Sequence, residues 1–126
     1  MPRGFDTPSG AELPNRLKEI AGTFLRGLQR GRAENRITPE QPITAGAIVT
    51  RWPAIRSTVD VRALVNYWRR EGEPIASSGH GYFYARTWDE LEPTVSQLED
   101  RMAAIQAARD GLLNGMRQKQ GQLFQD

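Results

Sequence analysis

Residues 57–85 read STVDVRALVNYWRREGEPIASSGHGYFYA, and this stretch decides the expected fold. Its first half predicts a helix, because four apolar residues have the i, i+3, i+4 and i+7 spacing of one helical face: Val61, Leu64, Val65 and Trp68. Ser57 and Asp60 have the spacing of a capping box, in which each side chain covers an unpaired amide of the new helix. Gly72 followed by Pro74 predicts the end of this helix, with a left-handed glycine cap.

The second half of this stretch changes from a helical to an extended pattern. Two short β-prone runs, residues 75–77 and 82–85, flank the four-residue turn Ser78-Gly79-His80-Gly81. Short β-prone segments on either side of a glycine-containing turn are typical of a β-hairpin. The sequence therefore predicts a hairpin directly after the capped helix.

A short helix is expected upstream of this stretch. Thr44 is a favourable N-cap for a helix over residues 45–52, and Pro53 ends that helix. The positions that we expect to face inward in it are Ala47, Ile48 and Trp52.

A longer helix is expected before that one. Apolar side chains recur at spacings of three and four over residues 11–31, which predicts an amphipathic helix with Pro14 in its first turn. The proline-containing segment 32–42 is expected to be a loop, and residues 1–10 a flexible leader.

These elements follow one another in the order of a winged helix-turn-helix. Residues 43–86 resemble the winged-helix domain of biotin-repressor-type regulators, and more closely small phage-encoded helix-turn-helix proteins that add a C-terminal helix. The run RREGEPIASSGHGYFYA at 69–85 carries this resemblance, because the family's recognition helix ends in Glu-Gly and its wing opens with Pro-Ile and closes with Gly-Tyr. The turn at residues 53–56 departs from the family in lacking its leucine-glycine pair.

The expected fold class is therefore mainly α with a small β-hairpin wing. We expect a winged helix-turn-helix domain over residues 11–88. A C-terminal helical arm with a disordered end would follow over residues 89–126.

The resemblance implies double-stranded DNA binding, with the helix after Ser57 in the major groove. Arg62 is suited to the O6 and N7 atoms of guanine, and Asn66 to the N6 and N7 atoms of adenine. Ser57 and Thr58 lie where a helix N-terminus favours a phosphate. The arginines expected to position the duplex through its phosphates are Arg51, Arg56, Arg69 and Arg70. Ser78 and His80, in the hairpin turn, are expected to touch the DNA backbone or the minor groove.

The C-terminal segment contains an apolar seam, which we define as Leu91, Val95, Leu98, Met102, Ile105, Leu112 and Met116. Its alternating spacings of four and three extend over more than three heptads and are interrupted at Arg109. Thr87 and Glu90 can cap the start of this helix, and Pro93 is expected to break it. A helix over residues 94–116 would be about 35 Å long. Either the seam folds back on the domain, or it pairs with a second copy; the residues expected to hold a homodimer are Val95, Leu98, Met102, Ile105, Leu112 and Met116.

Composition excludes several other classes of protein. The 126 residues include no cysteine and one histidine, so we expect no disulfide scaffold, no thiolate or histidine-rich metal site and no cysteine nucleophile. No paired carboxylates with a nucleophile stand out, and we expect neither an enzyme nor a cofactor. No run approaches the roughly 20 apolar residues that span a membrane, and no signal peptide is visible, so a cytoplasmic protein of a bacterial or phage-infected cell is expected.

Charge is unevenly distributed along the chain. The formal net charge is +2, and residues 89–126 alone carry four basic and seven acidic groups. The excess of positive charge therefore lies before residue 89, and 15 of the 17 basic residues are arginine. Two functions remain open: phage or prophage DNA binding for transcription or for recruitment of DNA-processing machinery, and a winged-helix adaptor that binds a phage or host protein. A positive face over Arg56, Arg62, Arg69 and the wing would favour DNA, and carboxylates interrupting it would favour the adaptor.

Overall fold

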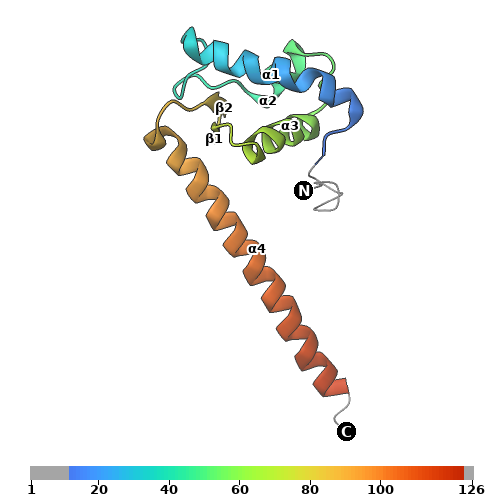
Figure 1. Cartoon of the computed structure of the whole chain (residues 1–126). Coiled ribbons are helices and arrows are strands. Elements are labelled where there is room, and N and C mark those ends of the chain that lie inside the picture. Colours follow the sequence, from blue (N-terminus) through green and yellow to red (C-terminus); the bar gives the residue numbers. More distant parts are fainter. Residues whose placement is uncertain (1–11, 124–126) are drawn as a thin grey trace. The chain divides into compact units, whose positions relative to one another are not determined.

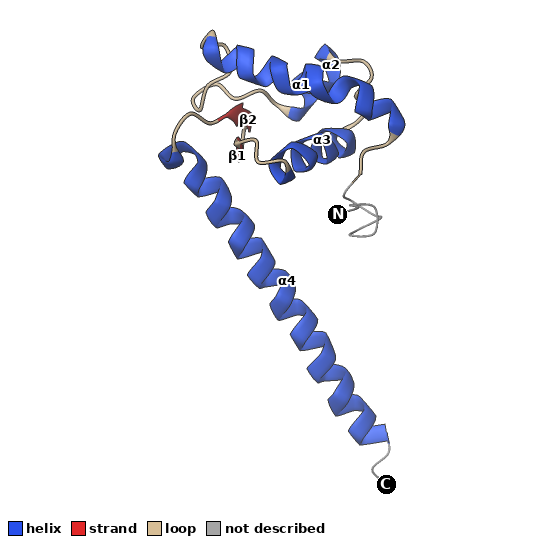
Figure 2. Cartoon of the chain, viewed as in Figure 1, coloured by secondary structure: helices blue, strands red, loops and turns tan. Residues whose placement is uncertain are grey.

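The computed structural model describes residues 12–123, and its elements follow the expected order (Figure 1). The six elements are α1 (Asn15–Ala33), α2 (Ala45–Arg51), α3 (Thr58–Arg70), β1 (Ile75–Ser78), β2 (Gly81–Tyr84) and α4 (Trp88–Leu123). The expected class is confirmed, since the fold is mainly helical with one small hairpin and a long C-terminal helix (Figure 2). The chain divides into two compact units between Leu91 and Glu92, three residues after the expected boundary. The predicted leader lies outside the described residues.

The described residues of the first unit form a hydrophobic core, to which α1 contributes its apolar face. Leu17, Phe24 and Leu28 of α1 are fully buried. The other large side chains that are fully buried come from α2, the turn after it, α3 and β1: Ile48, Ile55, Val61, Leu64, Val65 and Ile75. Burial of these faces is the main stabilising contribution to the unit, because each large apolar side chain contributes roughly 1.5–3 kcal/mol on leaving water.

Two glycines let neighbouring segments approach the backbone of α1. A Cβ atom at Gly27 would lie 2.6 Å from the Trp52 ring, and one at Gly31 would lie 2.5 Å from the Ile37 side chain. Trp52 and Ile37 are both buried, and the Trp52 ring also meets Phe24 edge-on at 5.6 Å. The loop after α1 and the end of α2 therefore pack directly on the helix surface.

Caps define the starts of α2 and α3 as expected. The Thr44 hydroxyl accepts a hydrogen bond from the Ala47 amide at 3.0 Å, and the Ser57 hydroxyl accepts one from the Asp60 amide at 3.4 Å. Two details differ from the expectation. Ala47 is exposed, because Ile48 is the only buried residue of this seven-residue helix. The Asp60 carboxylate accepts from the amide of Arg56 rather than from that of Ser57.

The glycine cap predicted at the end of α3 is present. Gly72 has a φ of +94°, which favours glycine. The amide of Gly72 donates to the Arg69 carbonyl at 3.0 Å, and that of Glu73 donates to the Trp68 carbonyl at 2.9 Å. This pair of bonds is a Schellman motif, and it turns the chain from α3 toward the hairpin.

The hairpin pairs β1 with β2 in antiparallel register, with Ile75 opposite Tyr84 and Ser78 opposite Gly81. The turn is shorter than expected, because Ser78 and Gly81 belong to the strands and only residues 79–80 connect them. Ile43, before α2, adds an isolated bridge to Tyr82 through two hydrogen bonds of 2.9 Å. The chain before α2 is thus tied to the hairpin.

The predicted break at Pro93 is wrong. The hydroxyl of Thr87 accepts from the Glu90 amide at 3.2 Å, as the capping spacing predicts, and α4 then continues through Pro93 to Leu123. Pro93 is the sixth residue of the helix, so the backbone bond it lacks is the one to the exposed Asp89. A single missing bond in the second turn does not end a helix of 36 residues.

Candidate nucleic-acid interface

The structure orients α3 as its apolar spacing predicts. Val61, Leu64 and Val65 are buried. Trp68 is half-buried, and its indole N–H donates to the Ala21 carbonyl of α1 at 3.0 Å. These contacts set the rotation of α3 about its axis, and the side chains left exposed on it include Val59, Arg62, Asn66 and Arg70.

Asp60, the only carboxylate within α3, forms an ion pair with Arg16 of α1. Asp60 is buried, and the Arg16 guanidinium binds both of its oxygens, at 2.7 and 2.8 Å. The hydrogen bonds from Arg16 hold the pKa of Asp60 below its usual value, against the opposing effect of burial. The exposed charges of α3 are therefore positive.

Three polar side chains of α3 have no intramolecular partner in the described part of the chain: Arg62, Asn66 and Arg70, all of them exposed. Arg56, just before the helix, is also exposed, and its charge interacts with the Asp60 carboxylate. The nearest following carboxylates, Glu71 and Glu73, come after the last residue of the helix. The exposed side chains between Arg56 and Trp68 therefore include arginines and an amide group but no acid.

The N-terminus of α3 combines three of the predicted residues. Arg56, Ser57 and Thr58 lie together there and are exposed. Free amides and the helix dipole favour an anion at such a terminus. The structure therefore brings these three residues together at the N-terminus of α3.

Arg69 holds the hairpin in place. Its Nε donates to the Ile75 carbonyl at 2.8 Å, and an Nη donates to the Ser77 hydroxyl at 3.1 Å. Arg69 is accordingly half-buried and engaged with β1, whereas the sequence suggested a phosphate contact. Ser78 and His80 are exposed at the tip of the same hairpin, where the Ser78 hydroxyl accepts from the His80 amide at 3.1 Å.

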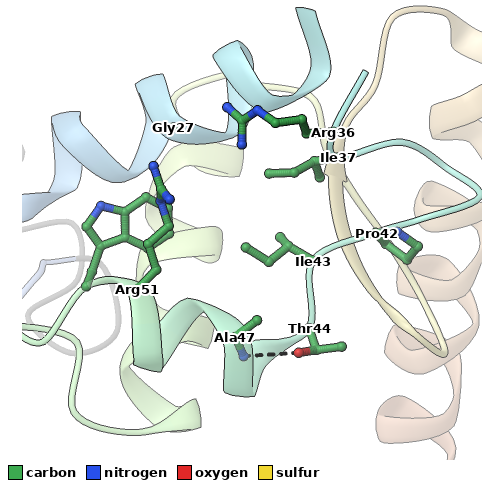
Figure 3. A pocket seen from close by; sticks show the side chains of 9 residues that line it. Gly27, Arg36, Ile37, Pro42, Ile43, Thr44, Ala47 and Arg51 are labelled. Carbon is green, nitrogen blue, oxygen red and sulfur yellow. Dashed lines mark hydrogen bonds between the residues drawn. The ribbon is translucent and has the colours of Figure 1, made fainter. Parts of the chain in front are cut away.

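Arg51 lies apart from the other predicted contacts. Its guanidinium carbon is 5.2 Å from the centroid of the Trp52 ring, and it lines a hollow formed by α1, α2 and the loop between them (Figure 3). No residue of α3 or of the hairpin lines this hollow. Arg26 and Arg30 gather beside Arg51 and were not among the predicted contacts, although they have the i, i+4 spacing of one helical face.

The apolar seam of α4 is exposed over much of its length. Val95 and Leu98 are half-buried, but four of the predicted dimerisation residues have exposed fractions of 59–76%: Met102, Ile105, Leu112 and Met116. Leu113, which lies outside the seam, is 48% exposed. A single α4 therefore leaves a row of large apolar side chains without a covering surface.

Within residues 12–123, no group of three or more histidine, aspartate and glutamate side chains could hold a metal ion. None of the helices in that range is long and apolar enough to span a membrane. In comparisons with known protein families, curated proteins and solved structures, none matches this chain.

Proposed function

We propose that residues 43–86 bind double-stranded DNA as a winged helix-turn-helix, with α3 as the helix that enters the major groove. The observation that carries this proposal is the exposed face of α3, on which Arg62, Asn66 and Arg70 have no intramolecular partner among residues 12–123. The only acid of the helix is removed from this face by Arg16. Glu71 directly follows Arg70, but no exposed acid lies beside Arg62 on the helix. Exposed arginine is the electrostatic pattern that phosphate binding requires.

The residues of this surface have different tasks in the proposed complex. Arg62 reads a guanine and Asn66 an adenine, since each side chain can form two hydrogen bonds with that base in the major groove. Arg56 and Arg70 contact phosphates, which adds affinity without sequence preference. Ser57 and Thr58 bind a phosphate at the N-terminus of α3, and Ser78 and His80 approach the backbone from the hairpin.

Two structural findings alter the set of contacts inferred from the sequence. Arg69 supports the site indirectly, because its hydrogen bonds to Ile75 and Ser77 fix the hairpin against α3. Arg51 belongs to the hollow beside α1, and we leave it out of the proposed DNA surface.

A second copy of the chain is the proposed partner of α4. The exposed seam residues recur at heptad spacing from Met102 to Met116, and pairing two such helices buries them against each other. A two-fold dimer presents two copies of α3 to two half-sites on the DNA. The net charge of −3 over residues 89–126 is consistent with an arm that does not bind phosphate.

The test is a binding measurement on the full chain with a random-sequence duplex at two salt concentrations, followed by selection of a preferred site. Arg62→Ala is compared with Arg101→Ala, which removes one exposed arginine from α4. We expect Arg62→Ala to weaken binding to the selected site by about 1–3 kcal/mol and Arg101→Ala to bind as the wild type does. Absence of salt-dependent duplex binding, or equal binding by both variants, would overturn the proposal.

A further inference from the structure

The hollow between α1, α2 and the loop that joins them is lined by apolar side chains on one side. Figure 3 shows Ile37 and Ile43 pointing into it, with Pro42 and Ala47 nearby on the loop and on α2. Its volume is about 300 Å³. The space is large enough for one apolar side chain of another molecule and is open to solvent.

Four arginines line the adjoining part of this surface. A second hollow of about 160 Å³ shares Gly27, Arg36, Arg51 and Trp52 with the first and adds Thr23, Arg26 and Arg30. No carboxylate of the described part of the chain lines either hollow. We call the two hollows together the arginine groove.

The charges of the arginine groove are only partly compensated within the described residues. Arg36 pairs with Glu34 at 2.8 Å, but both side chains are about half-exposed, and a pair of this kind contributes little. Among the residues that the structure describes, Arg26 donates only to the Thr23 hydroxyl, and Arg51 lies over the Trp52 ring. Arg30 makes no side-chain hydrogen bond or ion pair there. Like charges that converge in this way repel one another, and an anionic ligand relieves that repulsion.

We propose that the arginine groove binds an acidic peptide segment of a partner protein, with an apolar side chain in the hollow beside Ile37 and Ile43. Carboxylates next to that side chain would reach the guanidinium groups of Arg26, Arg30, Arg36 and Arg51. Arginine binds carboxylates through two parallel hydrogen bonds, so several acids in a row match this rim. The apolar anchor supplies the contact area that charge alone lacks.

The apolar side of the groove favours a peptide over a second DNA contact. A DNA backbone offers phosphate and sugar but no apolar group to occupy the hollow. The lining residues come from α1, α2 and their connection, so the groove and the exposed face of α3 share no residue. The inference is therefore independent of the proposed DNA binding, and either can fail without the other.

The test begins with a displayed library of random twelve-residue peptides selected against the full-length protein. We expect selected sequences to contain two or more aspartates or glutamates within a few residues of a leucine, isoleucine or phenylalanine. A synthetic peptide of the selected sequence is then titrated against the wild type and against the double variant Arg26→Gln, Arg30→Gln. Loss of at least tenfold in affinity is the expected result.

Two further variants separate the groove from general charge effects. The double variant Arg101→Gln, Arg117→Gln removes the same charge from exposed positions of α4 and should bind the peptide as the wild type does. Ala47→Phe fills the hollow without changing charge and should weaken the peptide at least fivefold. Thermal unfolding of each variant shows whether it is folded.

Three outcomes would overturn the inference. The first is a library selection without enrichment of acidic peptides, and the second is equal peptide affinity for the wild type and the groove variants. The third is a loss of duplex binding by the Arg26→Gln, Arg30→Gln variant as large as that of Arg62→Ala, which would make the groove a DNA surface. If the peptide binds as expected and no variant of α3 affects DNA, the proposed function fails while the groove proposal stands.

Discussion

Arg16 in α1 and Asp60 in α3 form a two-pronged ion pair, in which each terminal nitrogen of the guanidinium donates to a different carboxylate oxygen. The same carboxylate also accepts the amide of Arg56, directly before the N-cap of α3. A parallel arrangement occurs at α4, where the Glu90 carboxylate binds Arg32 of α1 at 2.7 Å and accepts the amide of Arg86. Two arginines of α1 thus hold the acids at the starts of α3 and α4.

The Arg16–Asp60 pair should make the stability of the fold depend on pH in the acidic range. Because the pKa of Asp60 is lowered in the folded protein, the stabilisation is complete above the unfolded pKa of about 3.9 and is lost as the pH falls through the folded value. Denaturant unfolding from pH 6 to pH 2 should show a smaller loss of stability on acidification for Asp60→Asn and for Arg16→Gln than for the wild type. If both variants keep the wild-type pH dependence, the pair does not form in solution.

Arg56 and Arg62 should affect DNA binding in different ways. Arg56→Ala removes a phosphate contact, so we expect weaker binding to every sequence and a salt dependence whose logarithmic slope is smaller by about one. Arg62→Ala should instead relax the preference at one base position. Titrations at several salt concentrations, with specific and random duplexes, distinguish the two effects. Identical behaviour of the variants would contradict the roles given to them.

Trp68 should be a major contributor to stability although it is only half-buried. Its ring meets Tyr67 edge-on at 4.9 Å, and its indole N–H donates to the Ala21 carbonyl. Trp68→Ala should lower the free energy of unfolding by about 3 kcal/mol, at the lower end of values for such truncations. Trp88→Ala is the control, because Trp88 is 60% exposed and should cost less than about 1 kcal/mol. Equal effects of the two changes would mean that α3 is rotated from this orientation.

Two glycine-to-alanine changes should have opposite signs. Alanine at Gly31 would place its Cβ against Ile37, so we expect a loss of about 1–3 kcal/mol from overpacking. Alanine at Gly111 meets no atom within 4 Å and should raise the helical stability of α4 by up to about 1 kcal/mol. Thermal unfolding followed by circular dichroism measures both. A stabilising Gly31→Ala would show that Ile37 is not packed on α1.

Arg109 should limit the association of α4. It interrupts the seam between Ile105 and Leu112, and its guanidinium binds the neighbouring Asp110 at 2.9 Å in an exposed pair. Arg109→Leu should tighten the proposed dimer by about tenfold or more, since burying one leucine contributes roughly 1.5–3 kcal/mol. Sedimentation equilibrium tests this, with Arg101→Leu, outside the seam, as the control. A wild type and an Arg109→Leu variant that both stay monomeric at tens of micromolar would exclude the dimer.

Local chemistry made much of the first unit predictable. The caps at Thr44 and Ser57 and the glycine stop at Gly72 depend on residues within a few positions of one another, and all three were found where the sequence placed them. The exposed position of Arg62 and Asn66 also followed from the apolar spacing of α3. Pro93 was misjudged because propensity describes a helix interior, whereas the missing bond lies near the start of a long helix.

The sequence by itself determined where α2 and α3 start, where α3 ends, that a hairpin follows, and which side of α3 is apolar. These features depend on short-range hydrogen bonds and on periodic burial, both of which involve residues close together in the chain. Only the tertiary structure decided which charged side chains remain available to bind another molecule. Arg16 reaches Asp60 across 44 positions, Arg69 turns to β1, and arginines from α1, its following loop and α2 meet in one groove. Such pairings depend on the distance between side chains in the folded chain, and a linear pattern of charges does not contain that distance.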